Sequence, residues 1–151
     1  MDTGIAPREL LVCSVGERLF ALDLDLVIQI IGHQAPIIPP QRRFFIEGLI
    51  EFRGEFIPLL NLGKRLDLEG APVTNKSVIV IVGLAGQNIG LVVDSVVRIQ
   101  PQNMDAVKEP PPKLQGVRAE FLSGVFNYNG RPLLWIKGES LIALRDGNAI
   151  S

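Results

Sequence analysis

The amino-acid sequence predicts a mainly β protein with two similar lobes, built as small barrels or sandwiches. Two observations lead to this prediction. Short apolar runs are separated by turn residues about every 8–12 positions, which is typical of antiparallel β folds. In addition, residues 10–31 match residues 79–100 when the chain is shifted along itself by about 70 positions, so one design occurs twice.

Identical residues at equivalent positions support this repeat. The matched pairs are Leu22 with Leu91, Asp25 with Asp94, Val27 with Val96, and Ile30 with Ile99. A second segment repeats in the same order. Residues 45–66 match residues 121–142, which pairs Gly48 with Gly124, Phe52 with Tyr128 and Gly54 with Gly130. Two similar lobes imply a seam between them, where we expect a partner or ligand to bind.

Each copy of the first segment predicts a β-hairpin followed by a short mixed segment. The expected strands are residues 10–15 and 19–24 in the first copy, and residues 78–84 and 89–93 in the second. The mixed segments, residues 25–30 and 94–99, each begin with an aspartate. Asp25 is suited to cap one helical turn there.

Each copy of the second segment predicts another hairpin and a short helical end. The expected strands are residues 45–52 and 55–60 around Arg53-Gly54, and residues 121–128 and 132–136 around Asn129-Gly130. Pro58 and Pro132 lack a backbone donor, which predicts edge strands or bulges at those positions. The helical ends are expected at residues 62–66 and 139–144.

We therefore expect a single domain over residues 10–145, between an N-terminal tail (residues 1–9) and a C-terminal tail (residues 146–151). Lobe one is expected at about residues 10–75 and lobe two at about residues 76–145. Two connections, residues 32–43 and 100–118, are rich in proline and therefore stiff and non-helical.

Composition argues against several classes of protein. The formal net charge is −1, from 15 basic and 16 acidic residues, so the chain lacks the basic surface of a nucleic-acid binder. The longest apolar stretch, residues 78–85, is far shorter than the roughly 20 residues of a membrane-spanning helix. No signal-peptide pattern opens the chain. We expect a soluble, cytoplasmic protein without membrane insertion.

The residues offer little support for an enzyme. His33 is the only histidine, so no histidine-based metal cluster can form, and no cofactor is expected. Cys13, the only cysteine, lies within an apolar run, which predicts a buried side chain rather than a thiolate nucleophile. Trp135 is expected in the core, and no glycine spacing forms a phosphate-binding loop. We expect neither a catalytic nor a metal site.

Gly48, Arg53 and Gly54 stand out in the segment GLIEFRGEFIPLL. A glycine within a strand weakens it unless a bend or a close backbone approach requires it. Arg53 is either an ordinary residue of the hairpin turn or an arginine at the seam that pairs with a carboxylate. The residues alone leave both interpretations open.

These residues resemble the CheW family, the adaptors of bacterial chemosensory arrays. The family motif around an arginine-glycine turn matches residues 45–62, FIEGLIEFRGEFIPLLNL, and a second block matches residues 90–96, GLVVDSV. The opening hairpin matches residues 11–30 and the closing block matches residues 122–144, so the resemblance covers nearly the whole chain in order.

The resemblance implies two SH3-like five-stranded β-barrels with short helices, packed against each other, and no catalysis. It also implies the partners: the cytoplasmic hairpin tip of a chemoreceptor, the regulatory domain of a CheA-type histidine kinase, and other CheW-like domains. The family's receptor-contacting positions correspond to Val27, Gly48 and Ile99, and its motif arginine to Arg53. The protein would lie at receptor arrays on the inner membrane.

One position departs from the family. Many members carry a glutamate that can pair with the motif arginine, and this position is Gln29 here. The usual asparagine of the motif is Glu51, two residues before Arg53 and on the same face of a strand. We therefore hypothesise that Glu51 partly replaces the missing carboxylate. The departure also suggests a divergent array.

The first interpretation of function is a non-catalytic scaffold that couples chemoreceptors to a CheA-type kinase. An alternative is an adaptor of a divergent chemosensory system that controls motility other than flagellar chemotaxis. A third, from a different class, is a twin β-barrel ligand-binding module for sugars or RNA, which requires aromatic side chains exposed on one face. A detached regulatory domain of a CheA-like kinase is a further alternative.

Overall fold

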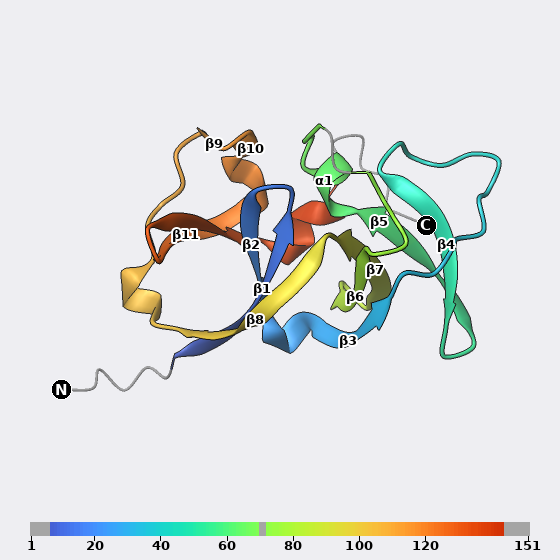
Figure 1. The fold of residues 1–151 in the computed structure, drawn as a ribbon, viewed down its shortest axis with the longest axis horizontal. Coiled ribbons are helices and arrows are strands. Elements are labelled where there is room, and N and C mark those ends of the chain that lie inside the picture. The colour runs from blue at the N-terminus through green and yellow to red at the C-terminus, as the bar shows by residue number, and fades with distance from the viewer. Residues whose placement is uncertain (1–6, 70–71, 144–151) are drawn as a thin grey trace.

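The chain folds into two five-stranded sheets that pack against a common core (Figure 1). This computed structural model describes residues 7–69 and 72–143. The strands of the first sheet are, in spatial order, β11 (Leu122–Tyr128), β12 (Arg131–Ile136), β2 (Arg18–Asp23), β1 (Arg8–Val15) and β8 (Ser95–Gln102). Those of the second are β3 (Val27–Gly32), β6 (Val78–Leu84), β7 (Gln87–Val93), β5 (Glu55–Asn61) and β4 (Ile46–Phe52).

Short elements connect these strands. They are the helix α1 (Leu62–Arg65), the 3-10 turns η1 (Leu24–Leu26), η2 (Met104–Ala106), η3 (Ala119–Phe121) and η4 (Gly138–Leu141), and the strand pair β9 (Lys113–Leu114) and β10 (Val117–Arg118). Within the described ranges, no helix is long and apolar enough to cross a membrane. The mainly β, two-lobe architecture predicted from the sequence is confirmed. Because β8 does not pair with β11, nor β3 with β4, each lobe is an open sheet rather than a closed barrel.

Each sheet combines strands from both halves of the chain. The first hairpin, β1–β2, pairs with β8 on one side and with β12 on the other, both from the second half. The second hairpin, β6–β7, pairs in the same way with β3 and β5 from the first half. The predicted lobe boundary near residues 75 and 76 therefore does not coincide with the division between the sheets. The two repeats have exchanged strands, because each hairpin completes its sheet with the other copy's segments.

The four predicted hairpins are present. The turn residues Arg53 and Gly54 have φ values of 52° and 79°, and Asn129 and Gly130 have values of 53° and 84°. Positive φ at both central positions is the type I′ geometry, whose twist matches that of the flanking strands. The helical ends follow β5 and β12 as α1 and η4. Of the predicted 139–144 segment, residue 144 lies outside the described residues.

Two local predictions were wrong. Asp25 does not cap a helical turn, because η1 already begins at Leu24 and places Asp25 in its middle. Pro58 and Pro132 lie neither in edge strands nor at bulges, since β5 and β12 are each flanked on both sides and the ladder shifts in these hairpins fall at residues 46–48 and 122–124. Instead, each proline comes immediately before the first residue of a parallel pairing, Leu59 with β7 and Leu133 with β2, so its missing N–H removes no bond there.

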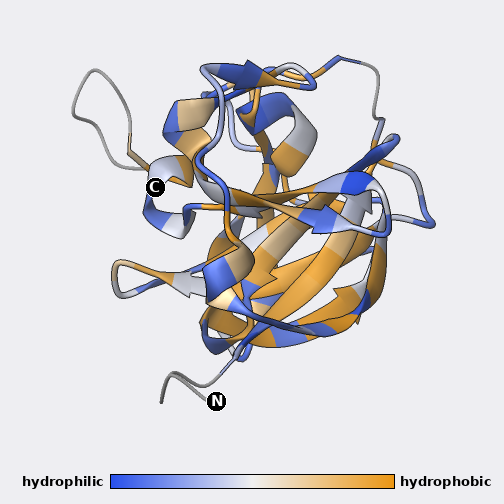
Figure 2. Ribbon diagram, turned by 90° about the vertical axis from the view of Figure 1, so that its left-hand side faces the viewer, coloured by the Kyte–Doolittle hydropathy of each residue, from blue (hydrophilic) through white to orange (hydrophobic). Residues whose placement is uncertain are grey.

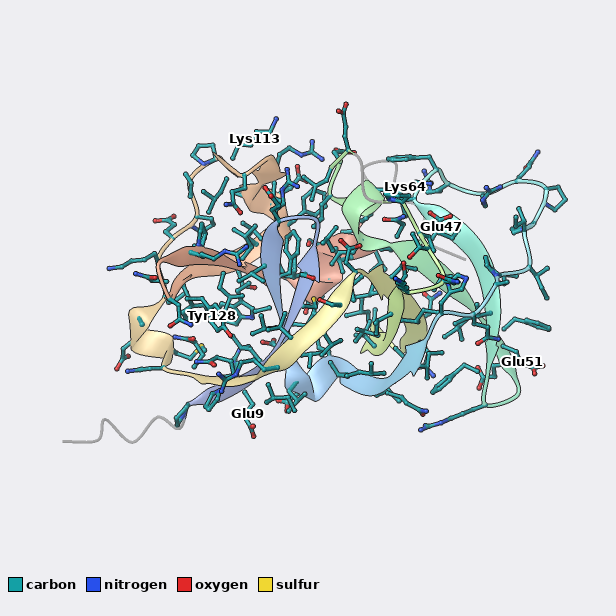
Figure 3. The ribbon with its side chains drawn as sticks, viewed as in Figure 1. Glu9, Glu47, Glu51, Lys64, Lys113 and Tyr128 are labelled. Carbon is teal, nitrogen blue, oxygen red and sulfur yellow. The ribbon has the colours of Figure 1, made fainter. Side chains whose placement is uncertain are left out.

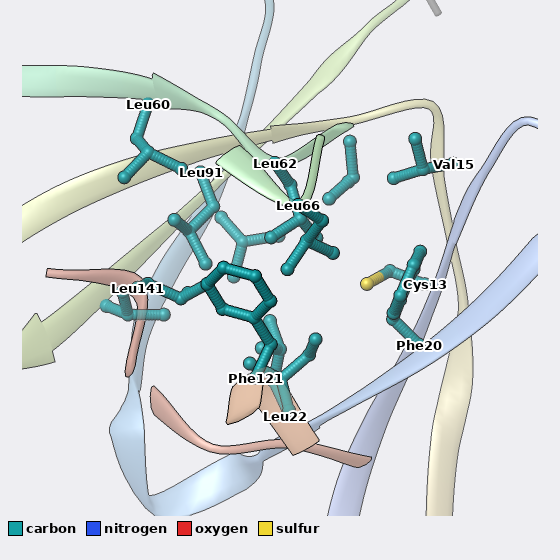
Figure 4. Packing of buried hydrophobic residues seen from close by; sticks show 14 of the residues in the cluster. Cys13, Val15, Phe20, Leu22, Leu60, Leu62, Leu66, Leu91, Phe121 and Leu141 are labelled. Atoms are coloured by element: carbon teal, nitrogen blue, oxygen red, sulfur yellow. The ribbon is translucent and has the colours of Figure 1, made fainter. Parts of the chain in front are cut away.

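Three apolar clusters hold the sheets together. One lies against each sheet, around Phe126 and Trp135 in the first and around Phe52 and Ile57 in the second. The third, which we call the shared core, contains side chains from both sheets, including Phe20 and Leu91 (Figure 4). The central strands β1 and β6 alternate between their own sheet's cluster and the shared core. Figure 2 shows these apolar strands inside and hydrophilic residues mainly in the turns and connections.

Candidate functional site

The end strands β3 and β8 carry exposed apolar side chains at equivalent positions of the two repeats. Figure 1 shows both strands beginning where the sheets meet and running outward in opposite directions. Their exposed fractions are 39% for Ile28, 42% for Ile30, 46% for Val97 and 47% for Ile99. Because an edge strand offers unpaired backbone groups as well as these side chains, it is well suited to contact another molecule.

A β-bulge occurs at the same place in both strands. In β3 the ladder with β6 shifts between Val27 and Gln29, which makes Ile28 the extra residue. In β8 the ladder with β1 shifts across Val97, between Val96 and Arg98. A bulge re-aims the side chains that follow it and increases the local twist. The internal duplication therefore extends to the irregularities of the edge strands.

The bulges bring apolar side chains to the shared-core side of both sheets. Ile30 lies opposite Val80, and Ile99 lies opposite Leu11, and both partners belong to the shared core. Val27 is half-buried and packs against the same cluster. We call Val27, Ile28, Ile30, Val97 and Ile99 the seam surface. Of the predicted receptor-contacting residues, Val27 and Ile99 thus lie on the two edge strands, each on the side of its sheet that faces the shared core.

Arg53 connects the β4–β5 turn to β3. Its guanidinium donates a hydrogen bond to Gln29 Oε1 at 3.3 Å and lies 4.8 Å from the centre of the Phe52 ring. Gln29, at the position where the resemblance predicts a glutamate, is therefore the partner of Arg53. It accepts as a neutral amide, which makes the bond weaker than one to a carboxylate.

The hypothesised pairing of Glu51 with Arg53 is not seen among the described side chains. Glu51 is exposed, and Figure 3 shows it on the outside of the β4–β5 hairpin. The two residues do not share a strand face, because Arg53 has left the strand for the turn at φ 52°. The alternation rule used in the sequence analysis applies only within a strand.

Gly48, the third predicted contact residue, is buried beneath the connection from β3. Ile37 and Leu49 exchange two backbone hydrogen bonds of 2.8 Å, which lays residues 36–37 across the outer edge of β4 as a strap. A Cβ at Gly48 would lie 2.4 Å from the carbonyl oxygen of Ile37, and its φ of +149° is one that other residues rarely adopt. The absence of a side chain at Gly48 therefore allows the strap to approach β4 this closely.

The second repeat contains the same device. Lys108 and Val125 exchange backbone hydrogen bonds of 2.8 and 2.9 Å, and a Cβ at Gly124 would lie 2.3 Å from Val107 Cγ2. The two equivalent glycines thus allow two equivalent straps to cover the outer edges of β4 and β11. Covered edges are protected against unwanted strand pairing, whereas no segment among residues 7–69 and 72–143 pairs with the outer edges of β3 and β8.

A second group of exposed apolar residues was not predicted from the sequence. Ile37, Ile38, Phe44 and Phe56 all lie on the strap, its continuation and the start of β5. Their spacing shows no single period, so the pattern did not distinguish them from core residues. One of them could have been identified from the register of the β4–β5 hairpin, because Phe56 pairs there with the charged Glu51.

The structure does not favour Cys13 as a nucleophile. Cys13 is buried in the shared core, and loss of hydration raises its pKa to about 12, so the thiolate is strongly disfavoured. No group of three or more histidine, cysteine, aspartate or glutamate side chains within the described ranges could hold a metal ion. Trp135 is buried as expected, and its Nε1 donates to Asp23 at 2.9 Å.

Comparison with known proteins identifies the family. The CheW-like domain matches residues 9–146. The chain is 28% identical to the chemotaxis protein CheW of Treponema pallidum over 121 residues, 78% of this chain and 71% of the relative. It is 25% identical to a probable chemotaxis protein CheW of Rhizobium etli over 142 residues, 94% of this chain and 92% of the relative.

A solved structure has the same fold. The crystal structure of the scaffolding protein TtCheW from Thermoanaerobacter tengcongensis superposes with a TM-score of 0.87 and 29% sequence identity, covering 95% of this chain and 97% of that one. The family match and the fold agree over nearly the full length, and the two relatives align over 78% and 94% of this chain. The chain belongs to the CheW-like domain family.

Proposed function

We propose that this protein is a non-catalytic adaptor that couples chemoreceptors to a CheA-type histidine kinase. Membership of the CheW-like family supports this function, and the seam surface is the observation that carries it. Four exposed aliphatic side chains lie on two open edge strands, one from each sheet. An amphipathic receptor helix can bury its apolar face against such a surface.

The mechanism we propose is geometric. The two edge strands belong to different sheets, and the shared core fixes these sheets relative to each other. A receptor helix that contacts both strands is therefore held in one orientation relative to the whole adaptor. Kinase bound elsewhere on the same rigid body then experiences a displacement of the receptor directly.

The kinase's regulatory domain is the second proposed partner, and other CheW-like domains are a third. Apolar residues outside the seam surface, including Phe44 and Phe56, are available for these contacts. In an array many weak contacts act together, so each can be modest without loss of function. The protein would accordingly act in the cytoplasm, at receptor arrays on the inner membrane.

Binding measurements with matched variants test the proposal. The dissociation constants of a chemoreceptor cytoplasmic fragment and of a CheA regulatory domain are measured for wild type, Val27→Asp and Ile99→Asp. Placing a carboxylate in an apolar contact leaves a charge without water or a partner, which weakens binding by at least tenfold, or about 1.4 kcal/mol. We expect this loss for the receptor fragment and not for the kinase domain.

Ile38→Asp is the control for the receptor measurement. Ile38 is also exposed and apolar, but it lies outside the seam surface. It should retain receptor binding at the wild-type level. If folded Val27→Asp and Ile99→Asp both bind the receptor fragment as tightly as wild type, the seam surface is not the receptor site. If wild type binds neither partner, the adaptor function itself is contradicted.

A further inference from the structure

Arg65 lies between two phenylalanines that occupy the same place in the two repeats. Its guanidinium is 4.9 Å from the ring centre of Phe45 and 4.8 Å from that of Phe121. The equivalence of the rings extends to the backbone. The N–H of Asn61 donates to Phe45 O at 2.8 Å, and the N–H of the equivalent Lys137 donates to Phe121 O at the same distance. Arg65 thus lies beside two phenylalanines that are equivalent in the two repeats.

The same guanidinium also binds three backbone carbonyls. Arg65 donates to Leu141 O at 2.6 Å, Ser140 O at 3.0 Å and Ala143 O at 3.2 Å. These carbonyls lie at the end of η4, where backbone acceptors have no partner within the turn. A planar guanidinium can satisfy several acceptors in its plane while its faces stay available to aromatic rings, which an ammonium group cannot do.

These contacts join the two sheets. Arg65 is in α1, which follows β5 of the second sheet, whereas Phe121 and η4 flank β11 and β12 of the first. The start of α1 is itself held in place. Glu47 on β4 accepts from Asn61 and pairs with Lys64, at 3.0 Å in each case, and Figure 3 shows Lys64 beside Glu47. The arginine is therefore fixed to one sheet and binds the other.

The pairing is asymmetric. The repeat alignment places Leu141 at the position equivalent to Arg65, so the second copy contributes a carbonyl where the first contributes a cation. A further contact between the lobes accompanies it nearby, where Arg118 pairs with Asp67 at 3.1 Å. The side chains of that second pair are 39% and 54% exposed, so the pair should contribute little by itself.

The arginine and the seam surface contact the same apolar cluster. Two neighbours of Arg65 belong to the shared core, as Figure 4 shows: Leu66, which follows it in the chain, and Phe121, whose ring lies beside its guanidinium. Val27 of β3 and Val96 of β8 pack against that same core. A rotation of one sheet against the other therefore has to move both the arginine contacts and the two edge strands, since the core between them is close-packed.

We propose that Arg65 is a positioning residue that holds the two lobes in a single relative orientation, and thereby sets the spacing of the edge strands β3 and β8. The orientation is a property of the free protein. Its consequence for receptor binding rests on the proposed adaptor function.

A distance measurement between the lobes tests the proposal directly. Spin labels are attached at Glu9→Cys on β1 and Glu51→Cys on β4, which are exposed side chains on different sheets (Figure 3). Native Cys13 is buried and does not compete for the label. We expect one narrow distance distribution by pulsed electron paramagnetic resonance for the doubly labelled protein. Arg65→Met should broaden or shift it.

Lys113→Met is the matched control, because it removes a positive charge from an exposed side chain that takes no part in the contacts of Arg65 described above, and it should leave the distribution narrow. If Arg65→Met does not fold, Arg65→Lys gives the same test, since a single ammonium cannot reach all three carbonyls. If the distance distribution of the folded Arg65 variant has the same width and the same mean distance as that of wild type, the proposal is overturned.

Receptor binding provides a separate readout. If a tenth of the Arg65→Met molecules keep the wild-type orientation, the apparent dissociation constant for the receptor fragment rises about tenfold. A broadened distribution with unchanged receptor affinity would uphold the positioning role and contradict its connection to the receptor site. Failure of wild type to bind the fragment contradicts the adaptor function and leaves the distance result standing.

Discussion

Replacing Gly48 by alanine tests the strap that covers β4. The added Cβ would lie 2.4 Å from the carbonyl oxygen of Ile37 and 2.8 Å from Pro36 Cβ, closer than nonbonded atoms can approach. The backbone of residues 36–37 has to move away, because the conflicting atoms belong to it or to a rigid proline ring. That movement breaks the two hydrogen bonds between Ile37 and Leu49.

The free energy of this change has two parts. Forcing a non-glycine residue to a φ of +149° costs about 1–3 kcal/mol. Each of the two lost hydrogen bonds contributes a further 0.5–1.5 kcal/mol or so. The free energy of unfolding should therefore fall by about 2–6 kcal/mol, which for a chain of this length lowers Tm by roughly 8–16 °C at the middle of that range.

Urea unfolding and amide hydrogen exchange measure the effect. Exchange at Ile37 and Leu49 should accelerate more in Gly48→Ala than exchange in β6 or β7, because the strap is displaced first. Gly32→Ala is the control, since nothing lies within 4 Å of the Cβ it would add and its φ lies outside the glycine-favouring region. If the two variants unfold within about 0.5 kcal/mol of each other, the close-approach argument is refuted.

Three further predictions follow from other sites. Gly124→Ala should destabilise the protein by about 1–3 kcal/mol through its clash with Val107, and urea unfolding showing no loss relative to Gly32→Ala would contradict this. Gln29→Glu should stabilise the protein by about 0.2–1 kcal/mol, because it gives Arg53 a carboxylate partner. Thermal unfolding should show this gain at low salt and a smaller gain at 1 M salt. A destabilisation would show that Arg53 does not bind position 29. Burial of Cys13 raises its pKa from 9.0 to about 12, so between those pH values the unfolded chain binds fewer protons and stability falls by up to about 1.4 kcal/mol per pH unit. Cys13→Val should lack this component in unfolding measurements across pH 8–11, and identical slopes would contradict the burial argument.

Local signals made the hairpins predictable. Arg53-Gly54 and Asn129-Gly130 mark type I′ turns because few residues tolerate positive φ, and the flanking apolar runs identify the strands. Matching the two halves also predicted that the same elements recur, down to Gly48 and Gly124. These features depend on residues close together in the chain, where the geometry of each dipeptide constrains the outcome.

The partners of the strands were not predictable in the same way. The runs in β1 and β6 are apolar on both faces, because one face meets its own sheet's cluster and the other the shared core. Such runs carry no alternation from which to choose a neighbour. The exchange of β3 and β8 between the repeats is therefore set by long-range contacts. The sequence of neither strand indicates which sheet it joins.

Side-chain contacts across the lobes were equally hidden. The Arg53–Gln29 bond requires β3 to lie in the second sheet beside β6, whereas the sequence analysis considered only the neighbour Glu51. The rings and carbonyls that Arg65 contacts come from three separate segments of the chain. Nothing in the sequence around Arg65 distinguishes it from Lys64. Both contacts follow from the topology rather than from a motif.

Mapping the bound receptor fragment on the protein tests the central claim most directly. Amide chemical shifts of the isotope-labelled protein are recorded with and without a chemoreceptor cytoplasmic fragment. The adaptor account predicts that the largest changes fall on both β3 and β8, around Ile28, Ile30, Val97 and Ile99. Changes confined to one of these strands, or lying on the straps and hairpin turns instead, would contradict a receptor site that spans the two sheets.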